Sequence, residues 1–256
     1  MAKSHKPYWS QVKKVIRECD IILEVIDARF PKESRNLSLE KMVKSQNKKL
    51  IIVLNKADLV PENFVKEAIK ELSSIAPCVY ISVTKHHGSK NLFSIINKVR
   101  EGKAVKVGVV GYPNVGKSSI INLLRGHHSA PTSSKPGYTK SIQWIRISKG
   151  VLLIDTPGVV PFKGKRNLFL KGAMNIEKAE DPIKVIYEFF DDLKKRNIFD
   201  KLKAHYEINV DDNEAFLTEL AKKQYMLLKG GVLDLNRAAR KIYNDWLKGR
   251  LKLYWS

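Results

Sequence analysis

Cysteine is scarce in this chain of 256 residues, which carries only Cys19 and Cys78. Two cysteines are too few for a disulfide framework, and Cys78 opens an apolar run that is typical of a strand. We therefore expect both thiols to be reduced and structural, and the protein to be cytoplasmic. A small extracellular domain held together by disulfides is excluded.

Long hydrophobic runs are also lacking. No apolar stretch approaches the ~20 residues needed to cross a bilayer, and the first six residues, Met-Ala-Lys-Ser-His-Lys, lack the apolar part of a secretory signal. We find no strongly amphipathic basic helix, so we expect no membrane partner. The 43% hydrophobic content still provides for one good-sized core and a smaller appendage.

Acidic residues are few beside basic ones, 26 against 47, and the net charge is +21. The excess is concentrated in residues 85–150, which hold 12 Lys/Arg and a single acid, Glu101. Such a field favours phosphate backbones and predicts a polyanionic partner. The alternative is a lysine-rich composition with solvated charged faces.

Apolar runs rich in Ile and Val alternate with helical stretches, which predicts an α/β fold with a doubly wound, mainly parallel sheet. The expected strands are 21–28, 50–55, 78–83 and 106–111, followed by an antiparallel pair, 141–147 and 151–155. The expected crossover helices are 8–18, 36–46, 62–75, 90–100 and 117–125.

The strand signal stops near residue 172. Residues 182–195, 213–228 and 235–249 show apolar positions at helical spacing, and aspartates suited to N-caps precede the last two. We therefore expect two domains, an α/β domain over 1–172 and a small all-helical domain over 173–256, with 159–172 as the connection.

A phosphate-binding loop, Gly-Tyr-Pro-Asn-Val-Gly-Lys-Ser, spans residues 111–118 between a predicted strand and a predicted helix. Its glycines let backbone N–H groups converge on a β-phosphate at a helix N-terminus. Lys117 is expected to bridge the β- and γ-phosphates, and the Ser118 hydroxyl to bind Mg²⁺. The residues expected to hold the phosphates are Asn114, Val115, Gly116, Lys117, Ser118 and Ser119.

Asp155-Thr156-Pro157-Gly158 ends an apolar strand 37 residues after Ser118. Asp155 is expected to hold Mg²⁺, and the Gly158 N–H to sense the γ-phosphate. Between the two motifs, the Thr139 hydroxyl can bind Mg²⁺ and its N–H the γ-phosphate, which would order this loop only around GTP. Thr132 is a competing candidate, and a mobile polar loop is the alternative.

Asn55-Lys56-Ala57-Asp58 follows another apolar strand. Asp58 can accept hydrogen bonds from N1–H and the exocyclic amine of guanine, a pair that adenine does not offer. Asn55 would support the other edge of the purine, and the Lys56 stem would cover its ring. Ser82-Val83-Thr84 fits a loop whose backbone N–H contacts guanine O6.

The order of these motifs is the most informative feature, because the guanine motif precedes the phosphate loop instead of following it. This order resembles the circularly permuted GTPases of the YlqF/YawG family. Three further segments are similar to that family: Asp27-Ala28-Arg29-Phe30-Pro31, Lys135-Pro136-Gly137-Tyr138-Thr139, and residues 230–240 near the C-terminus. The resemblance implies GTP hydrolysis, a helical C-terminal domain, and assembly of the large ribosomal subunit on its rRNA.

Three residues bear on turnover. Val159 stands where many GTPases carry a water-positioning glutamine, so intrinsic hydrolysis should be slow. Asn114 matches the asparagine that related GTPases use to help bind K⁺, although loop turn chemistry also favours asparagine there. The resemblance implies an N-terminal histidine that orients water, for which His5 is the nearest candidate.

We therefore expect a GTPase that uses GTP/GDP and Mg²⁺, responds to K⁺ and acts as an assembly switch, with Lys117, Thr139 and Gly158 as catalytic groups. We expect a monomer whose partners are the large ribosomal subunit and its rRNA, without DNA. Two other classes stay open: an RNA-binding protein that uses GTP only structurally, and a metabolic P-loop nucleotide enzyme. Measuring the preference for GTP over ATP would test the metabolic enzyme, and a turnover assay with ribosomal subunits would test the RNA-binding protein.

Overall fold

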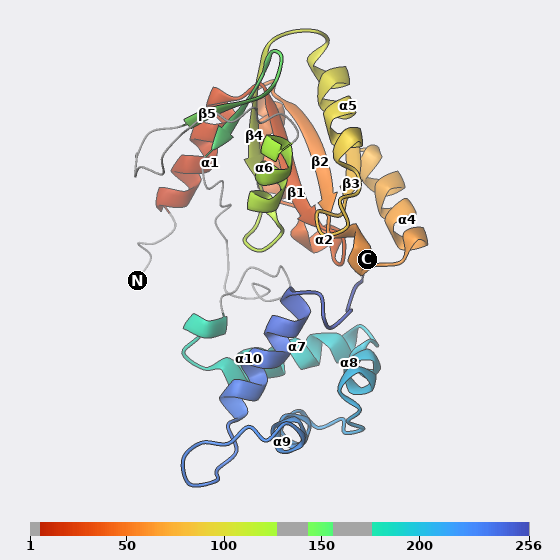
Figure 1. Cartoon of the computed structure of the whole chain (residues 1–256), viewed down its shortest axis with the longest axis vertical. Helices are drawn as coiled ribbons and strands as arrows, with labels where there is room; N and C mark the ends of the chain where they lie inside the picture. Colours follow the sequence, from red (N-terminus) through yellow and green to blue (C-terminus); the bar gives the residue numbers. More distant parts are fainter. Residues whose placement is uncertain (1–5, 127–142, 156–175, 256) are drawn as a thin grey trace. The chain divides into compact units, whose positions relative to one another are not determined.

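The computed structural model describes residues 6–126, 143–155 and 176–255 (Figure 1). The chain divides into two compact units, Met1–Arg166 and Asn167–Trp255. The first contains the six-stranded sheet, and the second consists of helices and one short hairpin in its described part. The domain boundary expected at residue 172 lies outside the described residues and stays a prediction.

The sheet has six strands in the order β3-β2-β1-β4-β6-β5. All neighbours pair in parallel except β5 and β6, which pair antiparallel. The predicted α/β class, with its antiparallel edge pair, is confirmed. The strand bounds are β1 Ile21–Asp27, β2 Lys49–Asn55, β3 Cys78–Ile81, β4 Val105–Val110, β5 Gln143–Ser148 and β6 Val151–Asp155.

The strands are continuous apolar runs because helices cover both faces of the sheet (Figure 1). Every residue of β1 is buried. Ile26, Ile52 and Leu54 pack with α4 on one face. Apolar residues of α5 and α6, among them Leu92, Ile96, Ile120 and Leu124, pack in a separate cluster with residues of β1 and β4. The helices of this unit are α1 Lys6–Glu18, α2 Pro31–Ser34, α3 Leu37–Ser45, η1 Ala57–Leu59, α4 Glu62–Ser73, α5 Ser89–Arg100 and α6 Lys117–Gly126.

The second unit packs around aromatic side chains. Phe190 meets Phe199 and Phe216 edge-on, with ring centroids 5.4 Å apart in both pairs. Edge-to-face contacts of this kind add to the free energy of burying the rings. The elements are η2 Ile176–Lys178, α7 Pro182–Lys195, α8 Phe199–Tyr206, α9 Asn213–Lys223 and α10 Leu235–Leu247. The sequence analysis did not predict α8.

Aspartate N-caps begin three of these helices. The side chains of Asp181, Asp212 and Asp234 each accept a hydrogen bond from a backbone N–H in the first turn of the helix that follows. These bonds satisfy N–H groups that have no partner inside the helix. The expected helix starts near 213 and 235 are therefore correct for the reason the sequence suggested.

The helix expected over 213–228 was too long, since α9 ends at Lys223. Tyr225 has a positive φ of 50°, and the chain then forms a tight hairpin. The Asp234 N–H donates to the Met226 carbonyl at 2.8 Å, and the Leu228 N–H donates to the Val232 carbonyl at 2.8 Å. The two glycines between Leu228 and Val232 allow this turn, which helical periodicity alone could not reveal.

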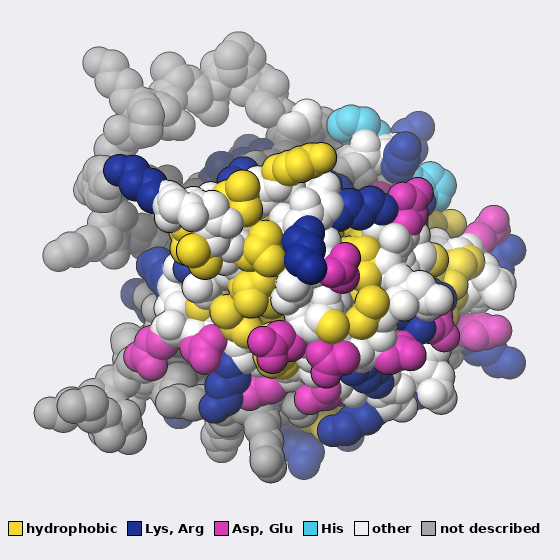
Figure 2. Space-filling model, turned by 90° about the horizontal axis from the view of Figure 1, so that it is seen from below, with side chains coloured by type: hydrophobic (Ala, Val, Ile, Leu, Met, Phe, Trp, Pro, Cys, Tyr) yellow, Lys and Arg dark blue, Asp and Glu magenta, His cyan; other side chains and the backbone are white. Residues whose placement is uncertain are grey.

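Charge and exposed apolar groups are distributed unevenly over the surface. On the face shown in Figure 2, hydrophobic side chains gather beside a row of acidic ones, with basic side chains among them. The positive excess is therefore not uniform over the molecule. The large hydrophobic side chains exposed in the described residues are Leu37, Ile75, Tyr225, Leu227, Leu228 and Val232. No helix in the described ranges has the length and apolar character to span a membrane.

Candidate functional site

The predicted motifs lie at the carboxyl ends of neighbouring strands. Asn55 ends β2, Ser82 follows β3, Gly111 follows β4 and Asp155 ends β6. Because these strands are parallel, the loops that follow them emerge at one edge of the sheet. In open α/β sheets this edge is where ligands bind.

The phosphate loop depends on two glycines. Gly111 has φ 153° and Gly116 has φ 99°, a region that side chains with a Cβ rarely adopt. A Cβ on Gly111 would overlap the Val25 carbonyl oxygen, and one on Gly116 would overlap the Asn55 amide nitrogen. The loop therefore passes very close to both β1 and the end of β2. Asn114 also has a positive φ of 61° and is exposed.

Lys117 is the first residue of α6, and its ammonium donates to the Tyr112 carbonyl at 2.6 Å, across the loop. Burial lowers the pKa of Lys117 to about 8 because the charged form loses solvation. A phosphate in the loop would supply the compensating negative charge. Ser118 is exposed and Ser119 is half-buried in the same first turn.

The guanine motif is tied directly to the phosphate loop. The Asn55 side chain is 3% exposed, and its amide donates to the Val115 carbonyl at 2.8 Å. These residues are 60 positions apart in the chain. Its amide oxygen has no hydrogen-bond partner in the described part of the chain. Asn55, predicted to support the purine, thus also fixes one loop against the other.

Asp58 joins the guanine motif to the loop after β3. Its two carboxylate oxygens accept hydrogen bonds from the Ser82 hydroxyl at 2.6 Å and the Thr84 hydroxyl at 3.0 Å. The sequence analysis assigned Ser82 and Val83 only a backbone contact with the base and missed this hydroxyl clamp. The sequence signal for it was two hydroxyl side chains, Ser82 and Thr84, placed two residues apart after a predicted strand. The two segments expected to read guanine are therefore in contact.

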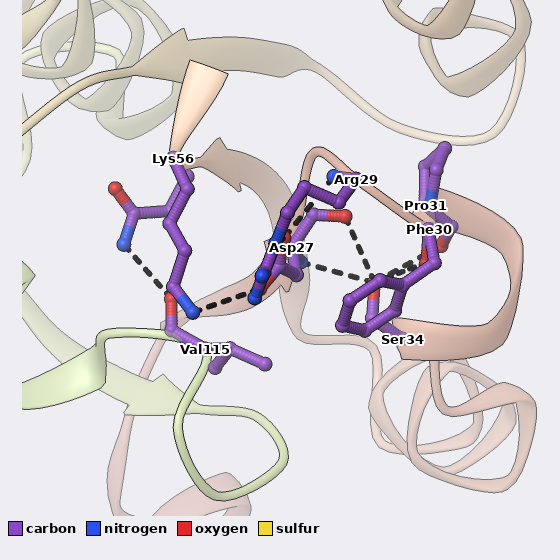
Figure 3. A network of polar contacts seen from close by, with 8 residues as sticks. Asp27, Arg29, Phe30, Pro31, Ser34, Lys56 and Val115 are labelled. Carbon is purple, nitrogen blue, oxygen red and sulfur yellow. Dashed lines mark hydrogen bonds and ion pairs between the residues drawn. The ribbon is translucent and has the colours of Figure 1, made fainter. Parts of the chain in front are cut away.

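Lys56 pairs with the Asp-Ala-Arg segment at the end of β1, as Figure 3 shows. The Asp27 carboxylate accepts from Arg29 at 2.8 and 2.9 Å and pairs with the Lys56 ammonium at 2.9 Å. Burial alone would raise the pKa of Asp27, but the charges of Arg29 and Lys56 lower it to about 2. Burial also lowers the pKa of Lys56.

Ser34 completes this network from α2. Its hydroxyl donates to the Phe30 carbonyl at 2.9 Å and accepts from the Asp27 N–H at 3.0 Å (Figure 3). The buried pair Asp27–Arg29 therefore braces the turn that carries Lys56, which has a positive φ of 62°. The sequence analysis noted the Asp-Ala-Arg-x-Pro segment only as a resemblance and assigned it no role in the site.

A second buried carboxyl lies behind the phosphate loop. Glu24 on β1 accepts a hydrogen bond from the Asn36 N–H at 2.7 Å, and the Asn36 amide donates to the Tyr112 hydroxyl at 3.2 Å. Full burial and the nearby Glu40 charge raise the pKa of Glu24. This line of contacts connects the core of the sheet to the second residue of the phosphate loop.

Several predicted site residues lie outside the described part of the chain: Thr139, Gly158 and His5. Asp155 is the last residue of β6, paired with Gln143 of β5. The roles assigned to these residues, and those of Asn114 and Ser118 as ion ligands, stay predictions.

Two family models match the chain. One, described as RsgA GTPase, matches residues 4–164, and the other, described as 50S ribosome-binding GTPase, matches residues 106–228. The structure of GNP-bound YlqF from T. maritima aligns with a TM-score of 0.70 and 27% identity over 94% of each chain. The chain belongs to the circularly permuted GTPases of the YlqF/YawG family. The predicted family is thus confirmed.

Relatives in other organisms are similar over nearly the whole chain. An uncharacterized GTP-binding protein of Methanocaldococcus jannaschii is 42% identical over 95% of this chain and 65% of its own length. Nuclear/nucleolar GTPase 2 of Arabidopsis thaliana is 38% identical over 97% of this chain and 44% of its own length. The chain therefore spans less than two thirds of the length of these curated relatives.

The chain is therefore similar to GTPases, among them proteins described as 50S ribosome-binding and as nuclear/nucleolar. Family membership implies a guanine nucleotide and Mg²⁺. The residues of the site fit both the guanine nucleotide and Mg²⁺. The glycine-dependent loop with its buried lysine suits phosphates, and the Asp58 carboxylate suits the guanine N–H groups. The exposed Ser118 hydroxyl is an oxygen donor of the kind that Mg²⁺ prefers.

Proposed function

We propose that this GTPase is a switch that acts in assembly of the large ribosomal subunit by binding rRNA. The observation that carries the proposal is the hydrogen bond between Asn55 and Val115, which joins the guanine motif to the phosphate loop in permuted order. The match to the 50S ribosome-binding GTPase model and the similarity to nucleolar GTPases support the ribosomal partner. The net charge of +21 supports an RNA partner.

We assign the chemistry of hydrolysis to residues around the phosphate loop. Lys117 would neutralise charge that develops on the β- and γ-phosphates, and Ser118, Thr139 and Asp155 would hold Mg²⁺. Gly158 would sense the γ-phosphate, and Asn114 would help to bind K⁺. Val159 offers no hydrogen bond to the attacking water, so the correctly assembled partner would trigger turnover.

The permuted order gives the switch a mechanical output. Residues 159–172 follow the γ-phosphate sensor and lead directly into the second unit. Ordering this segment around GTP would reposition an RNA-binding domain over residues 173–256 without a separate effector. A non-hydrolysable GTP analogue should therefore tighten binding to large subunits relative to GDP. Equal affinity in the two states would leave a GTP-binding RNA protein without a switch.

The central test measures GTP hydrolysis with and without large ribosomal subunits, in K⁺ and then in Na⁺ at the same ionic strength. We expect low basal turnover, stimulation by subunits, and slower stimulated turnover in Na⁺. Asn114→Ala should abolish the difference between the two salts while leaving GDP binding measurable. Absence of stimulation would contradict the ribosomal trigger, and equal rates in both salts would remove the K⁺ site.

We also propose that this protein is a monomer in the cytoplasm. The two cysteines, Cys19 and Cys78, are free in the structure, which suits a reducing compartment. Sedimentation of the full chain with GDP and with a GTP analogue tests the oligomeric state.

A further inference from the structure

A groove of about 1230 Å³ lies at the end of the sheet opposite the nucleotide loops. It is lined by α3, the first residues of β2, the loop from α4 to β3, and α5. Lys49 and Leu50 line it at the start of β2, whereas Asn55 of the guanine motif ends the same strand. The groove therefore shares no residue with the nucleotide site.

The groove presents apolar side chains to solvent. Leu37 is 60% exposed and Ile75 is 42% exposed, and these are the large exposed hydrophobic side chains in the described part of the first unit. Leu50, Ile95 and Val99 add half-buried apolar surface to the same lining. Exposed apolar side chains concentrated in a concave site indicate a binding surface more strongly than scattered ones do.

A group of lysines surrounds this apolar surface. The five lysines that line the groove form no ion pair within the described residues, although Lys48 donates to the Arg17 carbonyl. The lining has two acids, and one of them, Glu40, is already paired with Arg35 at 2.8 Å. Glu101 is the other acid, so the lining keeps an excess of lysines over acids. The five are Lys41, Lys44, Lys48, Lys49 and Lys98.

We propose that this groove binds an acidic, amphipathic segment of a protein partner. Apolar side chains of the segment would cover Leu37 and Ile75, and its carboxylates would pair with the surrounding lysines. The lining contains no aromatic residue to stack on bases and no arginine to form bidentate hydrogen bonds to phosphates. The apolar floor also offers nothing to a phosphate backbone. A protein segment thus fits the groove better than RNA does.

The test uses the full-length protein and a fluorescent probe peptide of about 18 residues, with leucines at helical spacing on one face and glutamates on the other. A scrambled peptide of the same composition is the control probe. Fluorescence anisotropy should show saturable binding of the amphipathic peptide and at least roughly ten-fold weaker binding of the scrambled one. Equal binding of the two peptides would overturn the proposal.

Two groove variants and one matched control locate the interaction. Leu37→Ser with Ile75→Ser removes the apolar contacts, and Lys44→Glu with Lys98→Glu reverses two charges. Each pair should weaken peptide binding at least roughly ten-fold. Lys13→Glu with Lys14→Glu, two exposed lysines of α1, reverses the same charge outside the groove and should change little. Undiminished peptide binding by both groove variants would overturn the proposal.

RNA binding and GDP binding separate this groove from the other functions. Both groove variants should keep the GDP affinity of the parent protein, because the nucleotide loops lie at the other end of the strands. Their rRNA affinity should match that of the α1 control. A larger loss of rRNA affinity in the Lys44/Lys98 variant than in the control would make the groove a nucleic-acid site and overturn the peptide proposal.

Discussion

Asp58 illustrates how one carboxylate can organise a site before it meets a ligand. Both of its oxygens are held by hydroxyls, Ser82 on one side and Thr84 on the other. The clamp holds the carboxylate beside the loop that follows β3 and limits its rotation. A hydroxyl that holds Asp58 is also a group that can turn toward a nucleotide, since its rotor is free to reorient.

Asp58→Asn should weaken GDP binding by roughly a hundred-fold or more, because the amide N–H₂ would face the guanine amine and charge-assisted bonds would be lost. Xanthosine diphosphate carries a carbonyl in place of that amine, so the same variant should bind it more tightly than the parent does. Calorimetric titration with both nucleotides measures the change. Unchanged GDP affinity and selectivity over ADP would show that Asn55–Asp58 does not read guanine.

The lowered pKa of Lys117 predicts how nucleotide affinity depends on pH. Its pKa of about 8 in the free protein should rise when phosphates bind, because only the charged ammonium pairs with them. Below pH 8 the lysine is charged before and after binding, so this group adds no pH dependence. Above pH 8 binding takes up a proton, and affinity falls as pH rises.

Calorimetry at pH 8 in two buffers of different ionisation enthalpy should show about half a proton taken up per GDP bound. Lys117→Ala should remove that uptake along with much of the affinity. If the parent protein binds GDP at this pH without proton uptake, the lowered pKa of Lys117 in the free protein is wrong.

At the scale of elements, the loops after β2 and β4 act as one unit. Gly116 allows the phosphate loop to pass against the Asn55 amide, and that amide in turn donates to the carbonyl of Val115. The bracing continues through Lys56 to Asp27 on β1. Three adjacent strands therefore contribute to the geometry of the guanine motif. The fully buried Arg29 is tolerated in this core because it pairs with the Asp27 carboxylate.

Gly116→Ala should reduce GDP affinity at least roughly ten-fold, because the added methyl group would displace Asn55 and break its bond to Val115. Gly102→Ala is a matched control. Gly102 also has a positive φ, 78°, but a Cβ there meets nothing within 4 Å. Gly102→Ala should lose roughly 1–2 kcal/mol of unfolding free energy from backbone strain, and Gly116→Ala should lose more because its Cβ overlaps the Asn55 amide. Equal GDP affinity in the two variants would show that the Asn55 contact is irrelevant to binding.

At the scale of the whole molecule, the proposal concerns two units with different charge. Residues 85–150 carry 12 Lys/Arg and one acid, whereas residues 160–256 carry 20 Lys/Arg against 14 acids. Bulk electrostatic attraction to RNA should therefore come mainly from the first unit. The second unit should contribute selectivity for its partner more than affinity.

Affinity of the full chain for an rRNA fragment should fall steeply with salt. With about six phosphate contacts, raising KCl from about 50 to about 200 mM should weaken binding roughly 10³-fold. Filter binding or anisotropy over this range gives the slope directly. If affinity for the RNA fragment does not change with salt, the net charge of +21 lies on solvated surface and does not contact RNA.

The sequence by itself determined the features that depend on neighbouring residues. Apolar runs predicted the parallel sheet, capping aspartates predicted the starts of α9 and α10, and the motif order predicted a permuted GTPase. These succeed because strand burial, helix caps and loop glycines are set by residues within a few positions of each other.

Only the tertiary structure decided the contacts between distant segments. The Asn55–Val115 bond, the Asp58 clamp and the Asp27–Lys56 pair all join loops that strand order brings together, and no local pattern specifies which strands become neighbours. The hairpin after α9 was missed for a related reason. Its apolar residues fit a helix by spacing, but its 2.8 Å cross-turn hydrogen bonds and the positive φ at Tyr225 outweighed that local preference.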